Sequence, residues 1–241
     1  MVYYVKKDAD TIGKAIASLF TAQVLKKPDS VLGFATGSSP IPAYQAMIEL
    51  YKQGVADYSG VTTYNLDEYC GLSHDHDQSY HYFMMHNLFN FINVPHDRIH
   101  VPNGLASDFD AEGKAYDAAI DAAGGIELQI LGLGNNGHIG FNEPCDVYPQ
   151  ITHKVTLTAS TIEANKRFFA SADEVPKFAI TMGIGTIMKA RSIVLVATGK
   201  AKAAAVKAMI KDDPTPNCPA SILQFHPSVT VFLDADAASM L

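Results

Sequence analysis

Cysteine and positive charge are both scarce in this chain of 241 residues. The three cysteines, Cys70, Cys145 and Cys218, form neither a Cys-x-x-Cys pair nor an even set, so a disulfide framework and a zinc site are not indicated. Acidic residues outnumber basic ones by 25 to 18, which gives a formal net charge of -7. Nucleic acids and anionic membranes require basic surfaces, so we expect neither as a partner. Any anionic ligand must be bound by a local cluster of positive charge.

Long apolar runs, internal repeats and low-complexity linkers are also absent from the sequence. No 18 consecutive apolar residues occur, and residues 1–7 lack the apolar segment of a signal peptide. The chain can nevertheless bury a large core, because 48% of its residues are hydrophobic. We therefore expect a soluble, cytoplasmic protein with a single domain over residues 1–241.

Short β-rich or apolar segments alternate with segments of helical periodicity along the whole chain. The pattern predicts strands at 2–5, 31–35, 61–65, 98–101, 128–133, 154–158, 178–182, 192–197 and 229–233, and helices at 8–27, 42–51, 79–91, 108–123, 161–169 and 198–210. Alternation of this kind is typical of a doubly wound, mostly parallel sheet in a three-layer α/β/α sandwich, as in Rossmann-like folds.

Residues 128–144, which read L-Q-I-L-G-L-G-N-N-G-H-I-G-F-N-E-P, hold the strongest functional signal. An apolar run typical of a buried strand leads into three glycines at 132, 134 and 137, where positive φ angles and close approach of a ligand are possible. His138 and Glu143 follow on the loop, and such a pair can act as a base oriented by an acid. The alternative is a glycine-rich turn with one hydrogen-bonded histidine.

Other polar groups also follow predicted strands or begin predicted helices. The small-residue loop 36–39 could bind an anion on its N–H groups and hydroxyls, or could be an ordinary strand-to-helix turn. Asp67 and Glu68 follow another strand, as catalytic or merely solvated carboxylates. Arg167 and Lys202 could supply positive charge. Because the carboxyl ends of parallel strands meet at one edge, these groups together predict proton transfer on a small phosphorylated metabolite.

Four motifs in the sequence resemble those of the glucosamine-6-phosphate deaminases, whose fold group also includes the 6-phosphogluconolactonases. They are A-T-G-S-S-P at 35–40, Y-N-L-D-E-Y at 64–69, G-N-N-G-H-I-G-F-N-E-P at 134–144, and N-K-R-F-F at 165–169. The third is the most specific, because the lactonases usually continue T-A-S-L-F-P after the Gly-His pair and have no glutamate at the position of Glu143. The resemblance covers residues 31–231.

The resemblance implies conversion of glucosamine 6-phosphate and water to fructose 6-phosphate and ammonia. His138 would catalyse opening of the sugar ring, with Glu143 orienting and polarising its imidazole. Asp67 would move the proton between C2 and C1 through an enolamine. Asn136 stands where some members have an aspartate that helps to orient the histidine, and Glu68 receives no role.

For the substrate phosphate the resemblance implies Gly37, Ser38, Ser39, Arg167 and Lys202. It implies no metal and no organic cofactor. Residues 146–172 would form a lid within the single domain. The basic pair that binds an activator in hexameric members is replaced by His153 and Val155 in the aligned positions, so we expect a monomer or a small homo-oligomer.

Two other functions remain open from the sequence. One is a different enzyme on the same scaffold, either a 6-phosphogluconolactonase or another sugar-phosphate isomerase. The other is a sugar-phosphate-sensing effector module, since related domains serve transcription regulators. Such regulators normally carry a basic helix-turn-helix, and no N-terminal extension of that kind occurs here.

Overall fold

A parallel β-sheet forms the centre of the computed structural model, which describes residues 1–165, 169, 171 and 174–241. Its strands are β1 (Val2–Lys6), β2 (Val31–Phe34), β3 (Thr62–Asn65), β5 (Ile99–His100), β6 (Leu128–Gly132), β9 (Ser192–Ala197) and β10 (Val229–Asp234). In these residues the sheet has seven strands in the order β1-β10-β9-β6-β2-β3-β5, and every neighbouring pair is parallel. The predicted parallel sheet is confirmed.

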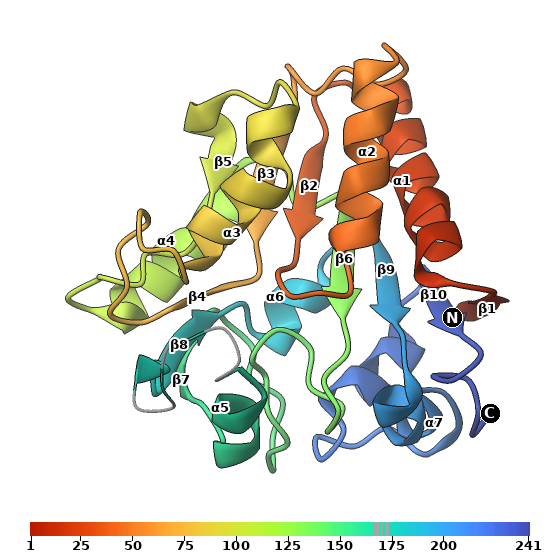
Figure 1. Ribbon diagram of the computed structural model, residues 1–241. Helices are drawn as coiled ribbons and strands as arrows, with labels where there is room; N and C mark the ends of the chain where they lie inside the picture. The colour runs from red at the N-terminus through yellow and green to blue at the C-terminus, as the bar shows by residue number, and fades with distance from the viewer. Residues whose placement is uncertain (166–168, 170, 172–173) are drawn as a thin grey trace.

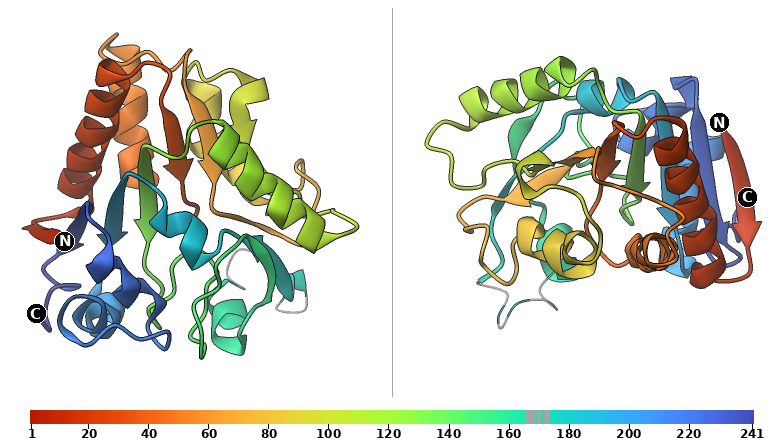
Figure 2. Two further views of the ribbon diagram at one scale, coloured as in Figure 1. Left: turned by 180° about the vertical axis from the view of Figure 1, so that it is seen from behind. Right: turned by 90° about the horizontal axis from the view of Figure 1, so that it is seen from above.

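Helices cover both faces of this sheet and complete the predicted three layers (Figure 1 and Figure 2). They are α1 (Ala9–Lys26), α2 (Ile41–Lys52), α3 (Tyr80–Asn87), α4 (Phe109–Ala122), α5 (Ala159–Asn165), α6 (Ile184–Met188) and α7 (Ala203–Lys211), with 3-10 turns at Phe89–Phe91, His96–Arg98, Lys200–Lys202 and Pro219–Phe225. The view from above places α1, α2 and α3 on one face, and α4 and α6 on the other. Within the described residues, no helix combines the length and apolarity needed to cross a bilayer.

The apolar face of α1 shows how periodicity selects the buried side chains. Ile12, Ile16, Phe20 and Val24 are all buried in the core, as their helical spacing predicts. Leu19, which the helical spacing predicts near the same side, is 39% exposed. It lies at the edge of the apolar stripe, where the surface of the helix begins to face away from the sheet.

The assignment of two predicted strands to the main sheet is corrected by the structure. The segments predicted at 154–158 and 178–182 form β7 (His153–Thr156) and β8 (Phe178–Thr181), which belong to a second sheet. Over the described residues that sheet has three antiparallel strands in the order β4-β8-β7, where β4 is Asp67–Tyr69. Asp67 and Glu68, predicted to follow a strand of the main sheet, themselves lie in this short strand.

Leu66 is the residue at which the chain passes from one sheet to the other. Its N–H donates to the carbonyl of Phe34 in β2, at 3.1 Å, and its carbonyl accepts from the N–H of Met182, at 2.7 Å. The first bond continues the parallel ladder and the second begins the antiparallel one. The main sheet and the second sheet are therefore joined directly at the residue before Asp67.

Candidate active site

The candidate site lies at the carboxyl edge of four adjacent strands of the main sheet, β9, β6, β2 and β3. Residues 198–202 follow β9, residues 133–143 follow β6, residues 35–40 follow β2, and Leu66 and Asp67 follow β3. Neighbouring strands lie about 4.8 Å apart, so these loops share one rim of the molecule (Figure 1). Strand ends of this kind are the usual ligand-binding edge of an open α/β sheet.

Glycines shape the loop after β6, but not all in the way predicted. Of the three glycines expected to allow positive φ, only Gly137 has one, at 86°, and Gly140 further along has 57°. Gly134 has a different role, because a Cβ atom there would lie 2.5 Å from the imidazole of His138. The missing side chain leaves room for the ring to fold back over the turn. The turn itself is closed by the N–H of Gly134 donating to the carbonyl of His138, at 2.9 Å.

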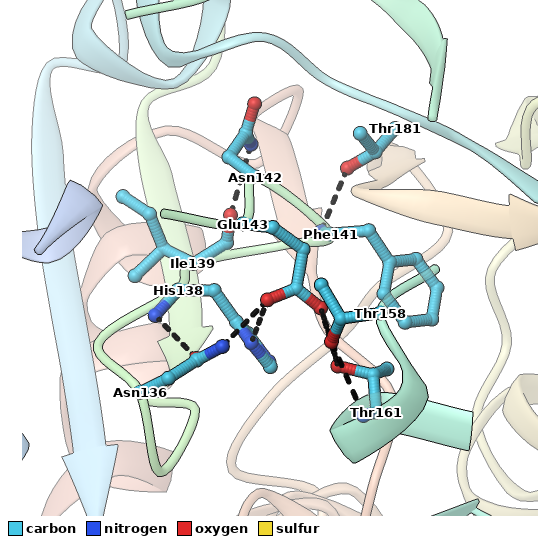
Figure 3. A network of polar contacts seen from close by, with 9 residues as sticks. All are labelled: Asn136, His138, Ile139, Phe141, Asn142, Glu143, Thr158, Thr161 and Thr181. Carbon is cyan, nitrogen blue, oxygen red and sulfur yellow. Dashed lines mark hydrogen bonds and ion pairs between the residues drawn. The ribbon is translucent and has the colours of Figure 1, made fainter. Parts of the chain in front are cut away.

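Glu143 is the centre of a polar network that includes His138 (Figure 3). Its Oε2 accepts a hydrogen bond from the side-chain amide of Asn136, at 2.6 Å, and lies 3.4 Å from Nδ1 of His138. The second contact is at ion-pair distance but lacks hydrogen-bond geometry, so Nδ1 has no hydrogen-bond partner among the described residues. The other oxygen, Oε1, accepts from the hydroxyls of Thr158, at 3.2 Å, and Thr161.

This network keeps Glu143 ionised although the side chain is only 8% exposed. Burial by itself would raise the pKa of Glu143. The imidazole of His138 and the donors Thr161 and Asn136 outweigh burial and lower the pKa to about 2. Asn136 also accepts the backbone N–H of His138 through its Oδ1, at 3.2 Å. An amide can donate to one residue and accept from the other, which an aspartate at this position could not do.

The loop is also fastened to the second sheet beyond His138. The N–H of Phe141 donates to the hydroxyl of Thr181 in β8, at 3.0 Å. The side-chain amide of Asn142 donates to the carbonyls of Ile139 and Met182, at 2.9 and 2.8 Å. Figure 3 shows the bonds that join Phe141 to Thr181 and Asn142 to Ile139, on the side of the loop away from Thr161. The position of Glu143 is thus fixed on both sides.

Asp67 has the opposite surroundings. It is 6% exposed, and no hydrogen bond from a described residue reaches its carboxylate. Burial, and then the negative charge of Glu68, raise its pKa to about 8. Its Oδ2 lies 3.6 Å from the point that a Cβ of Gly140 would occupy. Asp67 and the loop that carries His138 are therefore on the same side of the molecule and packed against each other.

Glu68, which the sequence left without a role, fastens β4 to the N-terminus of α3. Its Oε1 accepts from the N–H groups of Tyr69 and Tyr80, both at 2.8 Å, and its Oε2 accepts from the N–H of His81, at 3.0 Å. Burial raises its pKa to about 7, against the effect of these hydrogen bonds. The bonds satisfy free N–H groups of the first turn of the helix. No local pattern could reveal this contact, because its partners lie 12 and 13 residues away.

The loop after β2 turns at Gly37 and carries two serines. Gly37 has a φ of 92°, Ser38 is exposed and Ser39 is half-buried. The hydroxyl of Tyr44 in α2 fixes the start of the loop, because it accepts the N–H of Ala35, at 3.2 Å, and donates to the carbonyl of the same residue.

Neither serine of this loop is the N-cap of the helix that follows. The N-cap of α2 is Pro40, and no side chain caps the helix. The hydroxyls of Ser38 and Ser39 do not serve as caps and lie near the rim.

Lys202 lies at the same rim, at the junction between the 3-10 turn Lys200–Lys202 and α7, for which it is the N-cap residue. The continuous helix predicted from residue 198 is wrong, because residues 200–202 form a 3-10 turn and α7 begins at Ala203. Gly199 before it has a φ of 88°, and its N–H donates to both carboxylate oxygens of Asp234, at 3.0 and 2.9 Å. Arg167, the other predicted cation, lies outside the described residues.

The structure thus brings most of the predicted site residues to one rim. His138, Glu143 and Asn136 form one polar group, Asp67 lies against the same loop at Gly140, and the 36–39 loop and Lys202 follow the adjacent strands. Sequence reasoning missed Thr158 and Thr161. Among the described residues, no three His, Cys, Asp or Glu side chains are grouped so as to hold a metal ion. The arrangement offers an oriented imidazole and a protonatable carboxylate beside the small-residue loop 36–39.

A fold and site of this kind define a class of sugar-phosphate enzymes, and comparison with known proteins agrees. The model of the family of glucosamine-6-phosphate isomerases and 6-phosphogluconolactonases matches residues 6–232. The chain belongs to this family.

Relatives within the family are close and match over nearly their whole length. The chain is 55% identical over 232 residues to a glucosamine-6-phosphate deaminase of Thermoanaerobacter pseudethanolicus (strain ATCC 33223 / 39E), which covers 96% of this chain and 92% of that protein. It is 48% identical over 241 residues to a glucosamine-6-phosphate deaminase of Alkaliphilus oremlandii (strain OhILAs), with both chains fully covered.

Solved structures separate the two branches of the family. A monomeric glucosamine-6-phosphate deaminase superposes with a TM-score of 0.98 at 41% identity, and both chains are covered completely. A 6-phosphogluconolactonase of Thermotoga maritima superposes with a TM-score of 0.73 at 20% identity, covering 97% of this chain and 99% of that one. The lactonase shares the fold alone.

Proposed function

We propose that this protein is a glucosamine-6-phosphate deaminase, which converts glucosamine 6-phosphate and water to fructose 6-phosphate and ammonia. The observation that carries the proposal is the position of Asp67. It is a buried carboxyl without a hydrogen-bond donor among the described residues, packed against the loop that presents His138 and Glu143. A carboxyl with a pKa raised to about 8 is suited to take up and return a carbon-bound proton near neutral pH.

The order of steps follows from the acidity of the substrate. The proton on C2 becomes acidic only when an open-chain imine or carbonyl lies next to it, so the pyranose ring must open first. We assign ring opening to His138, with Glu143 and Asn136 orienting its imidazole. Asp67 then moves the proton between C2 and C1 through an enolamine. Loss of ammonia and addition of water give the ketose.

The phosphate is the part of the substrate that can be held away from the reacting carbons. We assign it to the loop of Gly37, Ser38 and Ser39, and to the cations Lys202 and Arg167. Such anchoring supplies binding energy without taking part in proton transfer. The lid at residues 146–172 and the cytoplasmic location stay predictions. We also propose that the chain acts as a monomer, because the 41% identical neighbour is a monomeric enzyme.

Two assays on the same preparation test the proposal against the lactonase and sensor alternatives. Ammonia release from glucosamine 6-phosphate is followed in one, and hydrolysis of 6-phosphogluconolactone in the other. We expect turnover in the first assay alone. Turnover of the lactone alone would assign the chain to the other branch, and binding of glucosamine 6-phosphate without turnover would make it a sensor.

A further inference from the structure

Two threonines at the start of α5 contact the side of Glu143 that faces away from His138. The hydroxyls of Thr158 and Thr161 both donate to Oε1, while Asn136 and the imidazole lie at Oε2. Thr161 is only 6% exposed, and Figure 3 shows it beneath the carboxylate. Neither residue belongs to the motifs that pointed to the function.

The two hydroxyls form a small unit with the first turn of the helix. Oγ1 of Thr158 accepts the N–H of Thr161, at 3.3 Å, and the two Oγ1 atoms lie 3.1 Å apart. A threonine that binds the N–H three residues ahead is a common way to begin a helix. The position of α5 therefore determines where the two donors lie.

The position of these donors also fixes Oε2, because the two oxygens of a carboxylate are rigidly connected. Donors at Oε1 restrict rotation about the last bond of the Glu143 side chain, and so fix the direction in which Oε2 faces Nδ1 of His138. The hydroxyl of Thr161 also favours the ionised form of Glu143. Among the described residues, His138 lowers the pKa of that carboxylate the most.

We propose that Thr161 is a positioning residue for ring opening, which acts through Glu143 on the imidazole of His138. Thr158 supports it from the same turn of the helix. The inference rests on the proposed deaminase function. It links the segment of residues 158–161 to the chemistry, although no residue of that segment need touch the substrate.

Three variants separate loss of the hydroxyl from loss of the side chain. Thr161→Val keeps the shape and removes the donor, Thr161→Ser keeps the donor, and Thr156→Val makes the same exchange at an exposed position of β7. We expect Thr161→Val to lower kcat about tenfold, the usual scale for one hydrogen bond to a charged group, with KM within about twofold. Thr161→Ser and Thr156→Val should both retain kcat within about twofold.

The pH dependence gives a readout that a merely structural role would not change. Loss of the donor raises the pKa of Glu143, so the titration of its carboxyl should move to higher pH in Thr161→Val and not in Thr161→Ser. Thr158→Val should lower kcat by a smaller amount, and this variant serves if Thr161→Val does not fold. Wild-type kcat in Thr161→Val, or an equal loss in Thr161→Ser, would overturn the proposal.

A measurement without substrate distinguishes failure of this inference from failure of the deaminase assignment. The carboxyl carbon of Glu143 can be titrated by 13C NMR in the wild type and in Thr161→Val. We expect a higher pKa of Glu143 in the variant whether or not ammonia is released. An unchanged pKa of Glu143 would overturn the inference, whereas absence of ammonia release from the wild type would overturn the assignment.

Discussion

Asp67 and Glu143 belong to one site, yet their surroundings are opposite. Both are buried, at 6% and 8% exposure. Glu143 is held by donors on both of its oxygens, and its pKa falls to about 2. Asp67 has no such donor among the described residues, and its pKa rises to about 8. The difference separates two functions, because a carboxylate that keeps its charge can orient an imidazole, while one that binds a proton at neutral pH can exchange it with the substrate.

The largest effect on kcat is expected when the proton-exchanging carboxyl of Asp67 is removed. Asp67→Asn should lower kcat at least about a hundredfold, the scale of a lost general base, while substrate binding stays largely intact. Steady-state kinetics and a binding titration measure the two effects separately. Unchanged turnover in this variant would remove Asp67 from the mechanism and with it one half of the comparison.

Neutralising the orienting carboxylate should have a smaller but still large effect. In Glu143→Gln one carboxylate oxygen is replaced by an NH2 group, which then faces hydrogen-bond donors instead of accepting from them. We therefore expect kcat to fall about 10- to 100-fold. The matched control is Glu127→Gln, because Glu127 is also buried, at 7% exposure, and accepts the N–H of Val31, at 2.5 Å, away from the rim. The control should lose stability but not kcat. Equal losses of kcat in both variants would mean that kcat depends on a buried carboxylate as such and not on the orientation of His138.

Phosphate binding should be separable from both carboxylates. Lys202→Ala should raise KM about tenfold with little change in kcat, since the phosphate is bound equally in the ground state and the transition state. Lys200→Ala, at an exposed position two residues earlier, is the control and should leave KM unchanged. Arg167→Ala is expected to act like Lys202→Ala. Wild-type KM in both the Lys202 and Arg167 variants would show that the phosphate site is misplaced.

The smallest effect concerns stability and has a definite sign. The pKa of Asp67 is raised from 3.8 to about 8 on folding, so the native state binds a proton that the unfolded chain releases, and stability falls as pH rises between these values. Asp67→Asn removes this cost. Its Tm should equal that of the wild type near pH 4 and exceed it by several degrees at pH 8. A Tm difference that did not grow with pH would contradict the unpartnered burial of Asp67.

Local patterns were enough to predict the main sheet and the residues at its rim. The apolar run of β6, the glycine-rich loop after it and the motif around Asp67 are each continuous in sequence. The second sheet was not predictable in the same way. The strands β7 and β8 are short, and a short strand gives the same pattern whether its neighbours are parallel or antiparallel.

The contacts that set the two carboxylates apart also depend on the folded chain. Thr161 reaches Glu143 from 18 residues away, and the N–H groups that Glu68 binds lie 12 and 13 residues from it. No motif connects these positions, because a single hydroxyl or backbone N–H can serve many partners. The sequence was therefore enough to predict Asp67, Glu143 and His138 as site residues. It did not predict the donors, present or missing, that set the pKa of each carboxyl.

The most direct test of the central claim follows the C2 proton itself. Glucosamine 6-phosphate carrying deuterium at C2 is incubated with the wild type and with Asp67→Asn, and the label is followed by NMR. We predict that the wild type removes the deuterium from C2, whereas Asp67→Asn binds the substrate and leaves the label in place at least about a hundred times longer. Loss of the label at the wild-type rate in Asp67→Asn would contradict the account.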